Sequence, residues 1–343
     1  MTTSTRVALA LGGGGARGYA HIGVIQVLVE RGYDIVAVSG TSMGALVGGV
    51  YAAGQLEAYT EWVGSLTQRD VIRLLDPALG VPGAFRGDRV MARVEELADV
   101  LIEDLPIPYT AVATDLLARK EVWFQRGPLV MAIRASIALP TVFPPVMLNG
   151  RLLADGSITN PVPIAPLSAT PADLTVAVNL AGPPGGRATH APVHESAEPR
   201  PVAEWADRLR RAAPHLMDTE LRPRLTAWLA GLRTEQDPQR PAEADGRTGL
   251  PEETGTPAAA TAPGRPAFSP LPPDLRTLDV MELSLDTVQS IVARYRLASY
   301  PPDVMVTVPK SACRTLDFHR GAEMVALGRT LAEQALDASP GGD

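Results

Sequence analysis

The sequence predicts an α/β protein with three layers, in which helices cover both faces of a central, mainly parallel sheet. Short apolar runs alternate with segments of helical apolar spacing along the chain, which is the pattern of parallel α/β folds. Glycine-rich turns follow the first two apolar runs, and each turn leads into a helical segment. Because ligand sites in such folds lie at the carboxyl ends of the strands, we expect both turns at one edge of the sheet.

The individual elements follow from the same spacing. Apolar runs predict strands at residues 6–11, 35–39, 109–114, 121–124, 146–148, 152–154 and 174–180. Helical spacing and capping residues predict helices at residues 19–30, 43–54, 57–75, 87–102, 127–139 and 160–168, with Asp88 as the cap of the fourth. Asn149-Gly150 predicts a tight hairpin turn between two of the strands.

A change of composition at Gly182 predicts how the chain is divided. Residues 6–181 are expected to form a catalytic core, and residues 182–273 a Pro-rich, flexible insertion. Within the insertion, residues 204–233 predict a short basic helical pair, which is either a lid or membrane-surface element or an extra pair packed on the domain. Residues 274–337 are expected to complete the core with a helix at 277–297, a strand at 304–308 and a helix at 318–336.

Composition limits the classes of function. The 343 residues are 45% hydrophobic and carry a net charge of −7, which argues against a nucleic-acid partner. No apolar run approaches the ~18 residues of a membrane span, and no signal peptide is recognised. The single cysteine, Cys313, allows no internal disulfide. We therefore expect a cytoplasmic protein.

Gly40-Thr41-Ser42-Met43-Gly44 has the G-x-S-x-G pattern between a predicted strand and a predicted helix. In that setting the turn holds the serine in a strained conformation at the end of the strand, and the flanking glycines remove steric clashes. The helix N-terminus favours negative charge beside the hydroxyl. The pattern predicts a nucleophile at Ser42; a glycine-rich turn with a serine cap is the alternative.

Residues 12–18, Gly-Gly-Gly-Gly-Ala-Arg-Gly, also lie between a strand and a helix. They match the dinucleotide pattern G-x-G-x-x-G, but the expected acidic residue does not end the second strand, since Asp34 precedes it. The same loop can instead supply an oxyanion hole from its backbone N–H groups. Arg17 is interpreted as an anchor of this loop or a source of positive charge.

Asp155-Gly156-Ser157 follows an apolar run that is expected to be buried, and an aspartate followed by glycine in this position usually indicates a turn. Because the proposed serine lacks a base, Asp155 is also a candidate for that role. The three motifs together resemble those of patatin-like phospholipases of the short bacterial type, in the same order along the chain. The stretches 135–140 and 143–145 and the segment around Asp317 are similar to that family too.

The resemblance implies the patatin-like fold and a hydrolase that cleaves acyl esters of lipids through a Ser–Asp dyad, without a metal or cofactor. It implies Ser42 as nucleophile and Asp155 as base. The implied oxyanion-hole loop comprises Gly13, Gly14, Gly15, Arg17 and Gly18, the nucleophile elbow includes Gly40 and Gly44, and the third motif includes Gly156. Lipid substrates also imply peripheral contact with the inner face of the membrane.

Three alternatives stay open from the sequence. A conventional Ser–Asp–His hydrolase would use His319, although its nucleophile would follow more strands than the two that precede Ser42. A non-catalytic lipid-binding or regulatory module would keep the pocket without turnover. Acyl transfer to an acceptor other than water would use the same residues as hydrolysis.

Overall fold

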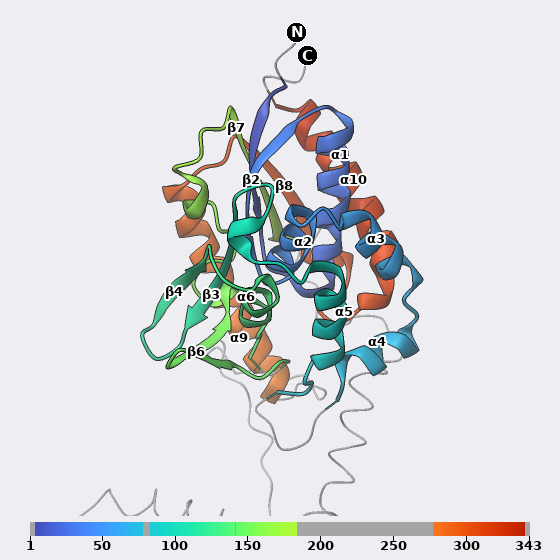
Figure 1. Cartoon of the computed structure of the whole chain (residues 1–343), viewed down its shortest axis with the longest axis vertical. Helices are drawn as coiled ribbons and strands as arrows, with labels where there is room; N and C mark the ends of the chain where they lie inside the picture. The colour runs from blue at the N-terminus through green and yellow to red at the C-terminus, as the bar shows by residue number, and fades with distance from the viewer. Residues whose placement is uncertain (1–3, 78–82, 141, 184–276, 340–343) are drawn as a thin grey trace, which may run out of the picture. The chain divides into compact units, whose positions relative to one another are not determined.

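The computed structural model describes residues 4–77, 83–140, 142–183 and 277–339 (Figure 1). These residues belong to one compact unit. The insertion predicted at residues 182–273, with its helical pair at 204–233, lies outside the described residues apart from its first two positions.

Eight strands of the described residues form one sheet, with the strand order β5-β6-β3-β2-β1-β7-β8 and with β4 also paired to β3. Neighbouring strands are parallel from β3 (Tyr109–Asp115) through β2 (Asp34–Thr41), β1 (Arg6–Leu11) and β7 (Leu174–Gly182) to β8 (Val304–Pro309). The antiparallel strands are β4 (Lys120–Phe124), β5 (Val146–Leu148) and β6 (Arg151–Asp155). The predicted mainly parallel sheet is confirmed.

Each face of the sheet packs against its own layer. Successive residues of a strand point to opposite faces, and in β1 Val7, Leu9 and Leu11 join the main core whereas Ala8 and Ala10 join a smaller cluster. The main core lies under α1 (Ala20–Glu30), α2 (Met43–Ala52), α6 (Leu129–Ser136) and α10 (Gly321–Asp337). The smaller cluster is closed by residues 162–167 and by the end of α9 (Thr277–Ser299). The predicted three-layer α/β/α fold is therefore confirmed.

Three predicted helices differ from the structure. Residues 57–75 form two helices, α3 (Leu56–Ser65) and α4 (Gln68–Leu75), because Thr67 starts a new helix through a capping box with Asp70. The helix expected at 87–102 is α5 (Asp88–Ala98), followed by a 3-10 turn at Ile102–Asp104, and Gly87 rather than Asp88 occupies its N-cap. Residues 160–168 contain only a 3-10 turn, Ala165–Leu167.

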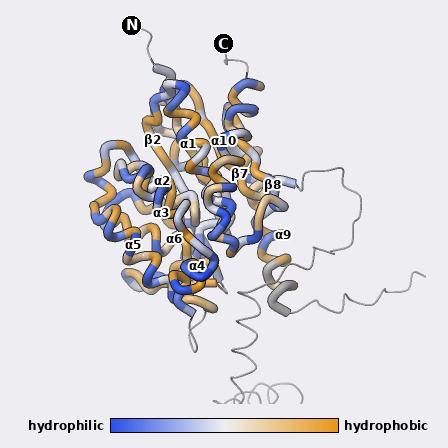
Figure 2. Tube along the Cα trace, turned by 90° about the vertical axis from the view of Figure 1, so that its right-hand side faces the viewer, coloured by the Kyte–Doolittle hydropathy of each residue, from blue (hydrophilic) through white to orange (hydrophobic). Residues whose placement is uncertain are grey.

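The C-terminal part completes the same sheet. Strand β8 pairs with β7, and α10 packs on α1. The two helices approach closely because Gly23 of α1 and Gly328 of α10 face the partner backbone: a Cβ on either would lie 2.1 Å from a carbonyl oxygen. Figure 2 shows alternating hydrophobic and hydrophilic stretches along α10, as expected for a helix with one buried face. Within the described residues, every helix is too short or too polar to cross a bilayer.

Candidate active site

Ser42 lies at the sharp turn between β2 and α2. Its φ of 55° is in the left-handed region, which is unfavourable for a residue with a side chain. The turn is tight because Gly40 and Gly44 allow close contact: a Cβ on Gly40 would lie 2.3 Å from the Gly44 carbonyl oxygen, and one on Gly44 would lie 2.0 Å from that of Leu11. The chain thus holds Ser42 in a strained conformation at the N-cap of α2.

Ser136, at the end of α6, supports this turn. The Ser42 N–H donates to Ser136 Oγ at 2.9 Å, and Ser136 Oγ donates to the Val112 carbonyl oxygen of β3 at 2.6 Å. Both serines are buried. In the sequence, residues 135–140 show only a similarity to the family, and no local pattern assigns Ser136 a role, because its partners lie 94 and 24 positions away.

Asp155 ends β6 and is fully buried. Its N–H donates to the Ala138 carbonyl oxygen, and its own carbonyl oxygen accepts from Thr114 Oγ1, both at 2.9 Å. In the side chain, Oδ1 accepts from the Ser157 N–H at 2.8 Å. Oδ2 has no hydrogen bond of ordinary geometry among the described residues.

Burial and hydrogen bonding act on the Asp155 carboxyl in opposite directions. Burial raises its pKa above the ordinary value, while the Ser42 hydroxyl and Ser157 lower it by hydrogen bonding; burial has the larger effect. Ser42 is therefore close enough to Asp155 to influence its ionisation. A carboxylate with a raised pKa is a stronger base than an exposed aspartate.

The glycine loop passes beside Ser42. A Cβ on Gly13 would lie 3.3 Å from the Ser42 Cβ, so the two backbones approach within side-chain contact distance. The Gly13 N–H is already donated to the Pro161 carbonyl oxygen at 3.0 Å. Gly15 has a φ of 58°, and a Cβ there would lie 2.4 Å from the Thr315 carbonyl oxygen. For the Gly14 and Gly15 N–H groups, the described part of the chain provides no acceptor.

Gly18 and Gly156 give the motifs their close packing. A Cβ on Gly18 would lie 2.3 Å from the Met43 Cβ, beside the serine turn. A Cβ on Gly156 would lie 2.2 Å from the Val112 carbonyl oxygen. Neither position has room for a side chain, so a larger residue would displace the loop or the strand that it touches.

Arg17 and His21 hold the glycine loop from outside. The Arg17 guanidinium donates to the carbonyl oxygens of Lys310 and Cys313, both at 3.2 Å, which ties the loop to the segment after β8. His21 is buried, and its Nε2 lies 2.8 Å from the Gly12 carbonyl oxygen. Burial lowers the pKa of His21 to about 4, so the ring is neutral and donates Nε2–H.

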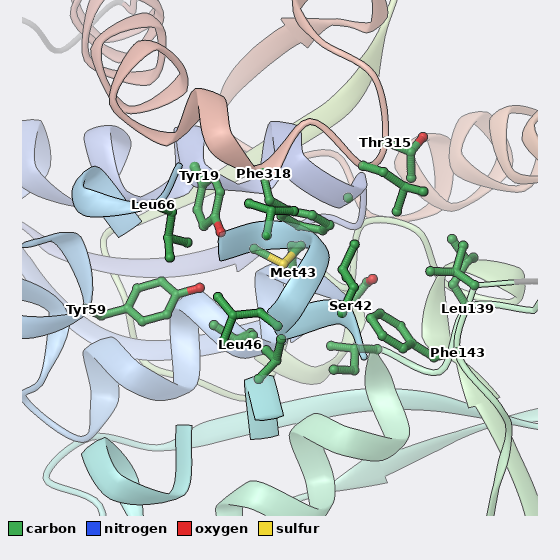
Figure 3. A pocket seen from close by; sticks show the side chains of 18 of the residues that line it. Tyr19, Ser42, Met43, Leu46, Tyr59, Leu66, Leu139, Phe143, Thr315 and Phe318 are labelled. Atoms are coloured by element: carbon green, nitrogen blue, oxygen red, sulfur yellow. The ribbon is translucent and has the colours of Figure 1, made fainter. Parts of the chain in front are cut away.

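An apolar cavity of about 720 Å³, including its mouth, opens beside Ser42 (Figure 3). Hydrocarbon and aromatic side chains from several helices and two loops form its wall. They are Tyr19, Met43, Leu46, Tyr59, Trp62, Leu66, Val71, Leu74, Leu75, Val90, Ile137, Leu139, Val142, Phe143, Leu316 and Phe318, with Gly15 and Thr315 beside them. The apolar lining suits a ligand with an apolar portion.

Two alternatives from the sequence find little support in this geometry. Asp34 is the first residue of β2 and pairs in register with Arg6, at the end of the sheet remote from the glycine loop, whereas a ribose-binding acid would be needed near that loop. His319 belongs to a 3-10 turn, Phe318–Arg320. Of that turn, Phe318 lines the cavity and His319 does not.

Comparison with known proteins agrees with the motifs. Residues 9–168 match the family model described as patatin-like phospholipase. An uncharacterized NTE family protein of Mycobacterium tuberculosis is 50% identical over 340 residues, which cover 98% of this chain and 93% of that protein. Human patatin-like phospholipase domain-containing protein 6 is 34% identical over 192 residues, covering 52% of this chain and 14% of that protein. The crystal structure of VipD from Legionella pneumophila superposes with a TM-score of 0.48 at 15% identity, covering 98% of this chain and 67% of that one.

The match to the patatin-like phospholipase model supports the class of lipid acyl hydrolases. More particularly, the chain belongs to the patatin-like phospholipase family, and its near full-length relatives carry the NTE family name.

Proposed function

We propose that the protein hydrolyses acyl esters of lipids through a Ser42–Asp155 dyad. One observation carries the proposal. Ser42, in a strained turn at the N-terminus of α2, borders an apolar cavity on one side. On the other side, its hydroxyl lowers the pKa of the buried Asp155 carboxyl group. Oδ2 of that carboxyl has no hydrogen bond of ordinary geometry among the described residues.

The proposed reaction has two halves. Ser42 Oγ attacks the ester carbonyl carbon while its proton passes to Asp155, and the tetrahedral intermediate collapses to an acyl-serine as the alcohol leaves with that proton. Water then attacks the acyl-serine and gives a proton to Asp155. Collapse of the second intermediate returns the proton to Ser42 Oγ and releases the carboxylic acid.

The negative oxygen of both intermediates needs hydrogen-bond donors. We propose the N–H groups of Gly14 and Gly15, because neither has an acceptor in the described part of the chain and Gly15 lines the cavity. Gly13 would shape the loop instead, since its N–H is donated to Pro161. The N-terminus of α2 adds its dipole to the same charge.

The apolar wall favours an acyl chain as the part of the substrate that enters the cavity. Transferring hydrocarbon from water to such a wall is favourable by about 0.8 kcal/mol per methylene. Because lipids with long chains reside in bilayers, we also propose that the protein meets its substrate at a membrane surface.

Substitution of the nucleophile tests the proposal. Ser42→Ala should lower turnover of soluble nitrophenyl esters, lysophospholipids and diacyl phospholipids by up to about 10⁶-fold, the loss found for a serine nucleophile elsewhere. A fluorophosphonate probe should label the wild type at Ser42 and leave Ser42→Ala unlabelled. Ser65→Ala, which changes an exposed serine at the end of α3, is the matched control and should keep both labelling and turnover.

Two outcomes would contradict the dyad. Equal activity of wild type and Ser42→Ala, or labelling at another serine, would remove Ser42 from the reaction. A wild type that binds lipid but is neither labelled nor active on any ester would favour the non-catalytic lipid-binding module.

A further inference from the structure

A second polar feature lies in the cavity, away from Ser42. Tyr19, from the 3-10 turn Gly15–Tyr19, and Tyr59, from α3, line the same cavity as Ser42. Figure 3 shows the two tyrosines on one side of the cavity, with their hydroxyls turned toward each other, and Ser42 on the other side. Leu46 and Leu66, which lie near the two tyrosines in Figure 3, are hydrocarbon.

Aromatic packing holds the two rings in place. Tyr19 packs edge-on against Phe318, with ring centroids 5.9 Å apart at 77°. Tyr59 packs on Trp62 at 5.6 Å, and the two tyrosine rings are 6.5 Å apart. Trp62 is covered in turn by the Arg93 guanidinium, 5.9 Å from its ring centroid. Such a cluster leaves the rings few alternative rotamers, so the hydroxyls have fixed positions.

The tyrosine pair keeps unused hydrogen-bonding capacity. The two hydroxyls are turned toward each other (Figure 3), and each influences the pKa of the other phenol; within the described residues neither has a hydrogen bond of ordinary geometry to a third group. Two hydroxyls that bond to each other use one proton, so one O–H donor and further lone pairs remain. Burial raises the pKa of both phenols, and both therefore stay neutral. A hydrocarbon chain end placed against the pair would bury these groups without a partner, which is unfavourable.

We infer that the cavity selects acyl chains that carry a hydrogen-bonding oxygen at the end remote from the ester, such as hydroxy- or keto-acyl groups. The hydrocarbon wall holds the methylene portion, and Tyr19 and Tyr59 hold the distal oxygen. The inference rests on the proposed function for placing the ester at Ser42, although selective binding does not require turnover. A water molecule that occupies the tyrosine pair, with a plain chain beside it, is the competing arrangement.

Binding to the Ser42→Ala protein separates selectivity from catalysis. The probes are ω-hydroxy and unsubstituted fatty acids of equal length, over a series of lengths, which compete with a fluorescent fatty acid. At the length that reaches the pair, the hydroxy acid should bind about tenfold more tightly, the factor of one ordinary hydrogen bond. Adding Tyr59→Phe, which keeps the ring, should reduce this preference, and adding both Tyr19→Phe and Tyr59→Phe should abolish it.

Tyr51→Phe is the matched control, because Tyr51 is a half-buried tyrosine of α2 that does not line the cavity. It should leave the preference unchanged, and circular dichroism should show that each variant is folded. Equal affinity for both acids at every length, or a preference that survives the double substitution, would overturn the inference. A preference that persists while wild type cleaves no ester would instead reject the proposed function and leave the inference standing.

Discussion

At the scale of single residues, His21 makes the stability of the glycine loop dependent on pH. The unfolded chain protonates this histidine near pH 6.5, whereas burial lowers its pKa to about 4 in the folded protein. Between these values the unfolded state binds more protons, so the free energy of unfolding decreases as the pH falls. The total loss from this group is about 3 kcal/mol.

A His21→Gln variant should lack this contribution. Urea unfolding of both proteins at pH 7 and at pH 4 measures it, because the other titrating groups are common to the two chains. The wild type should lose about 3 kcal/mol more than the variant on acidification. The same acid dependence in both proteins would contradict a buried, neutral His21.

Asp155 distinguishes the dyad from a triad that contains His319. Asp155→Asn keeps the side chain's shape but removes the proton acceptor, so turnover of a soluble ester should fall about 10²–10⁴-fold. His319→Ala should cost little, because His319 does not line the cavity. A folded His319→Ala protein with under ~1% of wild-type turnover would reject the dyad.

The acid limb of the pH–rate profile reports on the same carboxyl. Burial raises the pKa of Asp155, and the base acts in its ionised form. Activity should therefore be lost, as the pH falls, at a higher pH than an exposed aspartate would give. This limb should disappear from the residual activity of Asp155→Asn.

At the scale of elements, the contact of α1 with α10 depends on small residues. Gly328 faces the Ala20 carbonyl oxygen, and a Cβ there would lie 2.1 Å from it. Gly328→Ala must push the helices apart, and we expect a loss of about 1–3 kcal/mol in urea unfolding. The ion pair of Arg329 with Glu30 at the same contact is exposed and adds little.

Gly64→Ala is the matched control for this contact. Gly64 also lies in a helix, α3, but nothing lies within 4 Å of a Cβ added there. Alanine should stabilise that helix by up to about 1 kcal/mol. Two alanine variants with the same effect on stability would show that helix packing at Gly328 is unimportant.

At the scale of the whole molecule, the described elements form a sheet and layers without any residue between 184 and 276. Strands β7 and β8, on either side of that interval, pair directly. Replacing residues 183–273 by a short Gly-Ser bridge should therefore leave a folded protein. Its circular dichroism spectrum should show both helices and strands, and it should unfold cooperatively in urea. Aggregation of the shortened chain would show that the removed residues cover apolar surface of the core.

Much of this fold could be predicted from short-range patterns. The continuous apolar run of β1 and the tight turn at Ser42 depend on neighbours within a few positions, and the structure has both. One error was avoidable: the capping box of Thr67 and Asp70 is visible as a sequence pattern, and it starts a new helix within the long helix predicted at 57–75.

The sequence by itself determined the class of fold, the family and the motifs, because strand and turn preferences are local. Only the tertiary structure decided which groups are free to act. The Gly13 N–H is donated to Pro161 and the Ser42 N–H to Ser136. These pairings join positions that are far apart in the chain. No local pattern encodes them, since each depends on the packing of strands and helices that brings its two partners together.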